Sequence, residues 1–246
     1  MMREWIFEIR SRPFVLLVTL FLLVTLLVYA GATEPLDEAV QSALHQGSAG
    51  NPALDGVMQY VTETGDVFNM MIFGIIILLI PRTRRIGITL MILIVISTLL
   101  AGYIKCGVDR YGPEYEFEGV SFPVNISTDT FALFCEGSYG ASYPAGHAAR
   151  AMVFGVILGY ALSGRFPRGA YLMMAYPVLI SLSRMYVMQH YMMDVVGGMI
   201  MGAMLAGVLA HKTKLYKMFE EGGESNGVGS SRGDDANAAT AQGGPK

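Results

Sequence analysis

Residues 183–194, SRMYVMQHYMMD, place an arginine, a histidine and an aspartate in one short stretch of a very apolar chain. His190 and Asp194 are four residues apart, which on a helix brings both side chains to one face. A carboxylate behind an imidazole sets its tautomer and stabilises its cation, leaving the second ring nitrogen free to attack. Arg184 would hold two oxygens of an anion. The stretch predicts a nucleophile, its orienting carboxylate and an anion site; a structural hydrogen bond within a helix bundle is the alternative for the histidine and aspartate.

Two further segments carry residues of the same chemical kind. In YPAGHAAR, 143–150, Gly146 allows close backbone approach at the start of a helix, where amides bind anions. His147 would stand beside that anion as a proton donor to a leaving group. In YIKCGVDRYGP, 103–113, Lys105 and Arg110 come at the end of an apolar run. Together the three segments predict a cationic site with two histidines and one carboxylate.

A metal site built from His147, His190 and Asp194 is chemically possible. The neighbouring cations Lys105 and Arg184 would repel a metal ion, so the pattern favours an anionic ligand.

The elements that must position these residues are apolar helices. The chain has 246 residues, 53% hydrophobic and 15% charged, with a mean hydropathy of +0.45. A bilayer span needs ~20 apolar residues. The first apolar run exceeds the ~7–15 apolar residues of a signal peptide, so we expect it to be a retained helix. We predict an all-α integral membrane protein with about six transmembrane helices, at roughly 13–32, 67–80, 86–104, 148–163, 170–183 and 193–210.

Basic residues cluster at every second connection: before the first span, at 81–85, at 165–169 and at 211–217. The positive-inside rule then places both termini in the cytoplasm. The connections 33–66, 105–147 and 184–192 lie on the other side, so the predicted chemistry is extracytoplasmic. Within the first of them, 34–50 is predicted to form a short amphipathic helix on the outer membrane surface.

Residues 1–217 are predicted to form a single membrane domain, followed by a disordered cytoplasmic tail over 218–246. Gly198 and Gly202, with Ala206 after them, favour close packing inside the bundle over a dimer face. Cys106 and Cys135 fall in one outer connection, where an oxidising compartment would permit a disulfide; two free thiols are the alternative.

Ser183, Arg184, His190 and Asp194 match the motif S-R-x5-H-x3-D in full. With P-x-G-H upstream and a Lys-to-Pro segment before it, the chain resembles the type 2 phosphatidic acid phosphatase superfamily over roughly 60–210. These membrane lipid phosphatases are related to vanadium haloperoxidases. The resemblance implies that His190 attacks phosphorus, that Asp194 orients it, and that His147 protonates the leaving group. It further implies phosphate binding by Lys105, Ser183, Arg184 and the Gly146 amide.

Two positions depart from the family pattern. Ala145 stands where the family usually has serine, and Gly112 stands where it usually has arginine. Arg110 and Arg150 are the candidates to replace the missing phosphate ligands. The alternative for Arg150 is an ion pair at the end of its helix, with Asp109, Glu114 or Glu136.

The resemblance implies hydrolysis of a lipid phosphate or diphosphate on the outer face of a bacterial inner (cytoplasmic) membrane. It implies a phosphohistidine intermediate and neither metal nor cofactor. The expected partners are the membrane lipid substrate and the bilayer, with no nucleic acid. The alternatives are a lipid phosphotransferase, or a catalytically weak relative that binds or moves phospholipid. The acidic outer segment 114–143 is expected to roof the site.

Overall fold

The computed structural model describes residues 5–48, 51–113, 141–163 and 166–215. This part of the chain is helical and contains no strand, with one isolated bridge between Tyr111 and Ala141. Its longer helices are α1 (Arg12–Tyr29), α2 (Glu34–Ser48), α3 (Pro52–Thr64), α4 (Val67–Leu79), α5 (Arg84–Val108), α6 (Gly146–Ser163), α8 (Ala175–Tyr186) and α9 (Met192–Lys212). The short α7 (Pro167–Leu172) and the 3₁₀ turn Pro81–Thr83 complete it. The predicted all-helical class is confirmed.

Local sequence sets several helix boundaries. The side chain of Ser11 accepts a hydrogen bond from the Phe14 amide at the start of α1, with proline in the first turn. Asn51 and Asp66 cap α3 and α4 in the same way. Between the last two helices the chain bends by 57° at Gly65 and Asp66.

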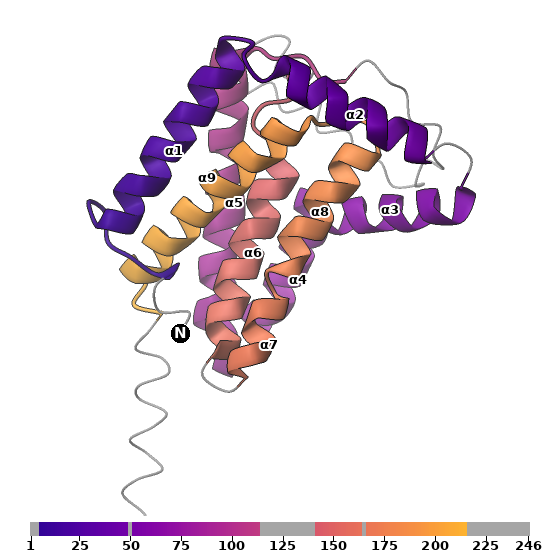
Figure 1. Cartoon of the computed structure of the whole chain (residues 1–246). Coiled ribbons are helices and arrows are strands. Elements are labelled where there is room, and N and C mark those ends of the chain that lie inside the picture. Colours follow the sequence, from indigo (N-terminus) through magenta and orange to yellow (C-terminus); the bar gives the residue numbers. More distant parts are fainter. Residues whose placement is uncertain (1–4, 49–50, 114–140, 164–165, 216–246) are drawn as a thin grey trace, which may run out of the picture.

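The middle of the bundle is α6, which packs against α5, α8 and α9 (Figure 1). Its residues from Ala148 to Ile157 are all buried, because helices surround it on several sides. Helix α1 lies along α9, α2 crosses one end of the bundle, and α3 runs across the bundle direction (Figure 1).

Small residues let α9 approach α6 closely. A β-carbon at Gly198 would lie 2.3 Å from the carbonyl oxygen of Ala145, and one at Gly202 would lie 2.3 Å from that of Ala149. Ala206 is also fully buried. This stripe therefore packs within the bundle, as the sequence favoured.

Three helical segments in the described residues are long and apolar enough to cross a membrane: α1, Pro81–Val108 and α9. A fourth results if α3 and α4 form one broken span. The predicted span 170–183 is instead divided between α7 and α8 at Met173 and Met174. Helix α6 is not among these segments, because the polar His147 and Arg150 near its start lower its mean hydropathy.

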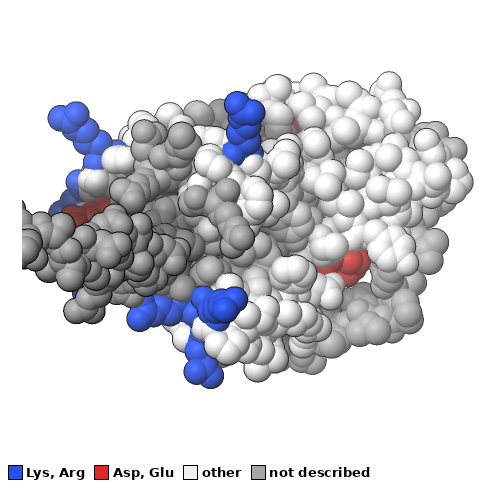
Figure 2. Space-filling model, turned by 90° about the horizontal axis from the view of Figure 1, so that it is seen from below, with Lys and Arg blue, Asp and Glu red and all other residues white. Residues whose placement is uncertain are grey.

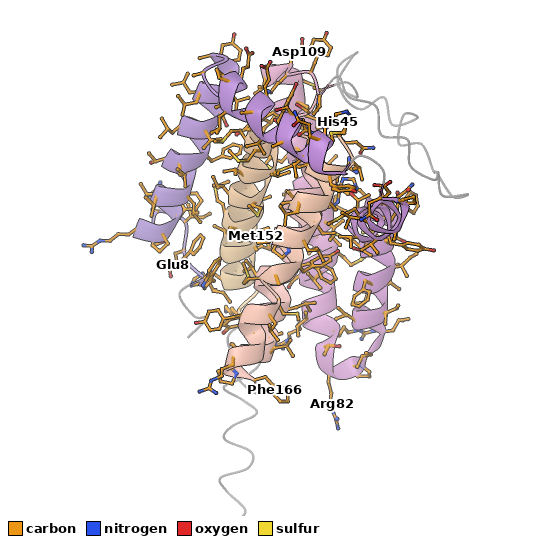
Figure 3. The ribbon with its side chains drawn as sticks, turned by 45° about the vertical axis from the view of Figure 1, so that its right-hand side comes forward. Glu8, His45, Arg82, Asp109, Met152 and Phe166 are labelled. Carbon is orange, nitrogen blue, oxygen red and sulfur yellow. The ribbon has the colours of Figure 1, made fainter. Side chains whose placement is uncertain are left out.

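The two ends of the bundle differ in charge. Figure 2, which views the end at α7, shows Lys and Arg side chains around it. The exposed basic residues that flank the helix ends there are Arg10, Arg12, Arg82, Arg84, Arg85, Arg168, Lys212 and Lys214. In Figure 3, Arg82 and Phe166 lie at this end of the bundle. His45 and Asp109 lie at the opposite end. Because the Phe7 amide donates to the carbonyl oxygen of Gly207, the first and last described segments lie at the basic end.

Candidate active site

The predicted nucleophile and its carboxylate lie at the end of the bundle that α2 crosses. His190 is in the connection between α8 and α9, and Asp194 is in the first turn of α9. One helix does not carry both residues, because the chain turns at residues 187–189, where Met188 has a φ of 55°. The two side chains still meet: His190 Nδ1 lies 3.7 Å from Asp194 Oδ2, close, but longer than a hydrogen bond.

Asp194 is fully buried and firmly held. Its Oδ2 accepts a hydrogen bond from the Tyr191 amide at 2.8 Å, which caps α9, and its Oδ1 accepts one from Arg110 Nη1 at 2.9 Å. A buried carboxylate needs such partners to remain charged. The site thus contains a fixed anion behind the imidazole.

His190 is 5% exposed, and its Nδ1 has no hydrogen-bond partner among the described residues. Burial disfavours the charged imidazole and lowers the pKa of His190 to about 4, even though Asp194 opposes this shift. The ring is therefore neutral at physiological pH, which is the form that can act as a nucleophile.

Two cationic side chains and a second histidine lie near His190, each from a different helix. Lys105 lies in the last turn of α5, His147 in the first turn of α6 and Arg184 in the last turn of α8. These three lie within electrostatic range of one another and of His190. Nε of Arg184 is buried without a partner in the described part of the chain. A buried unpaired guanidinium donor beside a neutral histidine is suited to an anion.

Residues at the α3–α4 bend contact both His147 and Arg184. A β-carbon at Gly65 would lie 3.2 Å from His147 Cδ2, so a larger residue there would make the imidazole shift by a few tenths of an ångström. Arg184 Nη1 lies 3.4 Å from Thr62 Oγ1, which accepts its hydrogen bond. Contacts between α3 and the site were not foreseen from sequence.

Arg150 is buried one turn after His147 and also binds the bend. Its Nε and Nη2 donate to the carbonyl oxygen of Gly65 at 3.3 and 3.2 Å, and Nη1 donates to Thr98 Oγ1 at 3.4 Å. A β-carbon at Gly146 would lie 3.1 Å from Arg150 Nη1, so the guanidinium borders the start of α6. Of the acidic partners considered from sequence, Asp109 is not among these acceptors, and Glu114 and Glu136 lie outside the described residues.

Two predicted phosphate ligands have other partners. Ser183 is fully buried, and its hydroxyl donates to the Ile180 carbonyl within α8. Arg110 donates from Nη1 to Asp194 and from Nη2 to Asp37 at 2.8 Å. Burial alone would lower the pKa of Arg110, but these two carboxylates raise it above the usual arginine value.

Asp37 is the main residue of this region that sequence reasoning missed. It lies in α2, is fully buried, and accepts hydrogen bonds from Arg110 and from the Met193 amide. Asp37 and Gln41, four residues apart, form the buried face of α2, while Leu36 is 48% exposed. Asp37 could have been found from sequence, because Asp37 and Gln41 share one face of a predicted amphipathic helix.

The two departing positions both border the His190–Asp194 segment. The Ala145 amide donates to the carbonyl oxygen of Asp194 at 3.0 Å. A β-carbon at Gly112 would lie 3.5 Å from the Gln189 carbonyl oxygen, an ordinary contact. Cys106 lies in the last turn of α5. Cys135 and residues 114–140 of the expected roof lie outside the described residues, so the disulfide and the role of the roof stay predictions.

Comparisons with known proteins place this geometry in a family. The chain is 29% identical over 154 residues to an undecaprenyl-diphosphatase from Sulfolobus acidocaldarius, covering 62% of this chain and 68% of that protein. Its fold matches a transmembrane PAP2 type phosphatidylglycerolphosphate phosphatase from Bacillus subtilis, with a TM-score of 0.63 and 22% identity, covering 86% of this chain and 98% of the other. The model of the PAP2 superfamily matches residues 86–216, more than half of the sequence. The chain is a membrane protein that belongs to the PAP2 superfamily.

Proposed function

We propose that this protein hydrolyses a lipid phosphate or diphosphate at the outer membrane face through a phosphohistidine on His190. The observation that carries the proposal is the setting of His190. It is a buried, neutral imidazole with Asp194 at Nδ1 and the unpaired donor Arg184 Nε nearby. The lipid phosphatase activities of the relatives support the same reaction class.

In the first step, Nε2 of His190 attacks phosphorus because Nδ1 faces Asp194. A phosphorus–nitrogen bond forms and the bond to the leaving oxygen breaks. His147, which takes up a proton when the anionic phosphate is bound beside it, donates that proton to the leaving oxygen. Asp194 stabilises the imidazolium character that develops on the ring. Lys105, Arg184 and the Gly146 amide at the start of α6 neutralise the charge on the non-bridging oxygens without a metal ion.

In the second step, His147 accepts a proton from water, which attacks the phosphohistidine. The phosphorus–nitrogen bond breaks, inorganic phosphate leaves, and His190 returns to its neutral form. Because the same cations serve both steps, one anion site suffices for formation and breakdown of the intermediate.

An apolar cavity of about 890 Å³ supports a lipid substrate. It lies between α3, α4, α6 and α8, beside the bend whose Gly65 contacts His147. Aromatic and aliphatic side chains line most of it, including Phe68, Phe73 and Phe154. We propose that it receives the acyl or prenyl tail laterally from the bilayer while the phosphate enters the cationic site.

The test is phosphate release by the purified protein in detergent from phosphatidic acid, phosphatidylglycerophosphate and undecaprenyl diphosphate. We expect release from at least one lipid, and we expect His190→Ala to reduce it to the no-enzyme rate because the nucleophile is lost. The thermal unfolding midpoint of the variant serves as the folding control. Release that persists in a folded His190→Ala protein would contradict the assignment of the nucleophile.

One observation favours a second candidate. Ala145 and Gly112 remove two side chains that bind phosphate in the family pattern, and losing one oxyanion donor can cost ~10²–10³ in rate. A catalytically weak relative that binds or moves phospholipid would bind these lipids without releasing phosphate. A phosphotransferase would instead release phosphate slowly to water and rapidly to an added alcohol or phosphate acceptor.

A further inference from the structure

Three charged residues run from the surface helix α2 to the site: the buried Asp37, the mostly covered Arg110 and the buried Asp194. Arg110 Nη2 lies 2.8 Å from Asp37 Oδ2, and Nη1 lies 2.9 Å from Asp194 Oδ1. Both aspartate side chains are 0% exposed and that of Arg110 is 11% exposed. The planar guanidinium can join two carboxylates at once, which a lysine ammonium does less well.

Arg110 is fixed by more than its two ion pairs. Its carbonyl oxygen accepts hydrogen bonds from the amide of Ser142 at 2.6 Å and from the Ser142 hydroxyl at 3.2 Å. Its guanidinium lies 4.5 Å from the ring centre of Tyr191, the residue directly after His190. The arginine therefore connects the segment before His147 to the segment that carries His190.

Asp37 connects the same unit to α2. While Oδ2 binds Arg110, Oδ1 accepts a hydrogen bond from the Met193 amide in the first turn of α9 at 2.9 Å. One turn further along α2, Gln41 donates to the carbonyl oxygen of Met185 at 3.0 Å. The buried face of α2 thus holds both ends of the connection that contains His190.

We infer that Arg110 and Asp37 are positioning residues for the His190–Asp194 pair, and that Arg110 is not a phosphate ligand. The inference rests on the proposed function for the role of His190. With Oδ1 held by Arg110 and Oδ2 by the Tyr191 amide, the Asp194 carboxylate cannot rotate, and Oδ2 stays the oxygen nearest His190 Nδ1. Asp37 fixes Arg110 in turn.

The charges around Arg110 disfavour a phosphate there. Both terminal nitrogens already bind carboxylates, so a phosphate would have to displace Asp37 or Asp194. It would also approach two buried anions, whereas Lys105 and Arg184 offer positive charge near His147. The two roles for Arg110 therefore predict opposite effects when Asp37 loses its charge.

The test compares Asp37→Asn with Glu38→Gln, a matched loss of one negative charge at the next, exposed residue of α2. An asparagine at 37 keeps an oxygen for the Met193 amide but loses the charge that holds Arg110. For each protein we would measure kcat and KM on the lipid that the wild type hydrolyses fastest, and the inhibition constant of inorganic phosphate. Arg110→Lys is the second variant, and thermal unfolding midpoints confirm folding.

We expect Asp37→Asn and Arg110→Lys to lower kcat at least tenfold while KM and the phosphate inhibition constant change less than twofold. Glu38→Gln should match the wild type. If Arg110 were a phosphate ligand, Asp37→Asn would free it and tighten phosphate binding, while Arg110→Lys would weaken it. Such opposite changes in phosphate binding would overturn the inference. So would an unchanged kcat in Asp37→Asn and Arg110→Lys, or a fall in kcat of the same size in Glu38→Gln.

A second readout is independent of lipid hydrolysis. Orthovanadate accepts an additional ligand and so reports on the placement of the nucleophilic nitrogen, whereas inorganic phosphate reports on the anion site alone. By calorimetry, we expect Asp37→Asn to weaken vanadate binding at least tenfold and to leave phosphate binding unchanged. Should the wild type hydrolyse no tested lipid, the proposed function would fail, while a selective loss of vanadate binding would still support the positioning role.

Discussion

His190 differs from an ordinary histidine because burial keeps it neutral. Its pKa is lowered from 6.5 to about 4, since the desolvation of the charged form outweighs the attraction of Asp194. In an unfolded chain the same residue would titrate near its usual value. Because the pKa of His190 differs between the folded and the unfolded chain, the free energy of unfolding depends on pH.

We expect acid to destabilise the protein through His190 between about pH 6.5 and pH 4. In that window the unfolded chain takes up a proton that the folded imidazole does not, so the free energy of unfolding falls by about 3 kcal/mol as the pH drops. His190→Gln removes this contribution. Thermal unfolding midpoints in detergent at pH 7 and pH 4.5 measure it, and an equal acid-induced drop in wild type and variant would contradict the prediction.

Restoring the family's phosphate ligands should strengthen phosphate binding. Ala145→Ser adds a hydroxyl beside the start of α6, and Gly112→Arg adds a cation where a β-carbon meets only ordinary contacts. A hydrogen bond to a charged group contributes about 1.5–3 kcal/mol, so we expect kcat/KM to rise about tenfold in each variant. Steady-state phosphate release measures it. A lower kcat/KM in both variants at normal expression would mean that the site has adapted to a different headgroup.

At the scale of elements, the contact between α6 and α9 sets the relative positions of the two histidine segments. Gly198 lies against the carbonyl oxygen of Ala145, directly before the turn of α6 that carries His147. The Ala145 amide in turn donates to the carbonyl oxygen of Asp194. A close helix crossing and one hydrogen bond therefore join the segment that carries His147 to the segment that carries His190 and Asp194.

Gly198→Ala should destabilise the protein and reduce its activity. The added β-carbon would lie 2.3 Å from a backbone oxygen, which cannot move without displacing α6. Overpacking of this kind costs about 1–3 kcal/mol, so we expect a fall of several degrees in the unfolding midpoint. Gly56→Ala is the control, because Gly56 is helical with no atom within 4 Å of its added β-carbon. Equal midpoints for the two variants would refute this account of the stripe.

Sequence patterns located most helices but not the tertiary contacts that complete the site. Apolar runs predicted α1, α4, α5, α6 and α9 closely, because burial and lipid both select such residues. The spacing of His190 and Asp194 suggested one helix, but the pair meets across a turn and a helix start. The burial of Asp37 depends on Arg110, 73 residues away, and such a pairing leaves no local pattern.

At the scale of the whole molecule, the two ends of the bundle have different chemistry. The end at α7 carries exposed arginines and lysines (Figure 2), and the opposite end carries α2 (Figure 1). The predicted catalytic residues lie at the end with α2. By the positive-inside rule the basic end would face the cytoplasm. The site would then face the other side of the membrane.

Paired cysteine substitutions test this orientation. Gly47→Cys lies on exposed α2, with open space at its β-carbon, and Arg168→Cys lies on exposed α7. In intact cells we expect a membrane-impermeant thiol reagent to label the first at least tenfold above wild-type background and the second only after permeabilisation, because the bilayer bars the reagent. The reverse pattern would place the site in the cytoplasm.

The buried ion pairs also set an order of biogenesis. Asp37 and Arg110 are synthesised well before Asp194, which arrives 84 residues after the arginine and in the last described helix. A nascent chain that already holds Arg110 and Asp37 still lacks Asp194, the carboxylate proposed to orient His190, until α9 has been made. On the proposed function, the protein would acquire its hydrolytic chemistry only at the end of insertion, so unfinished chains would not act on the lipids around the translocation machinery.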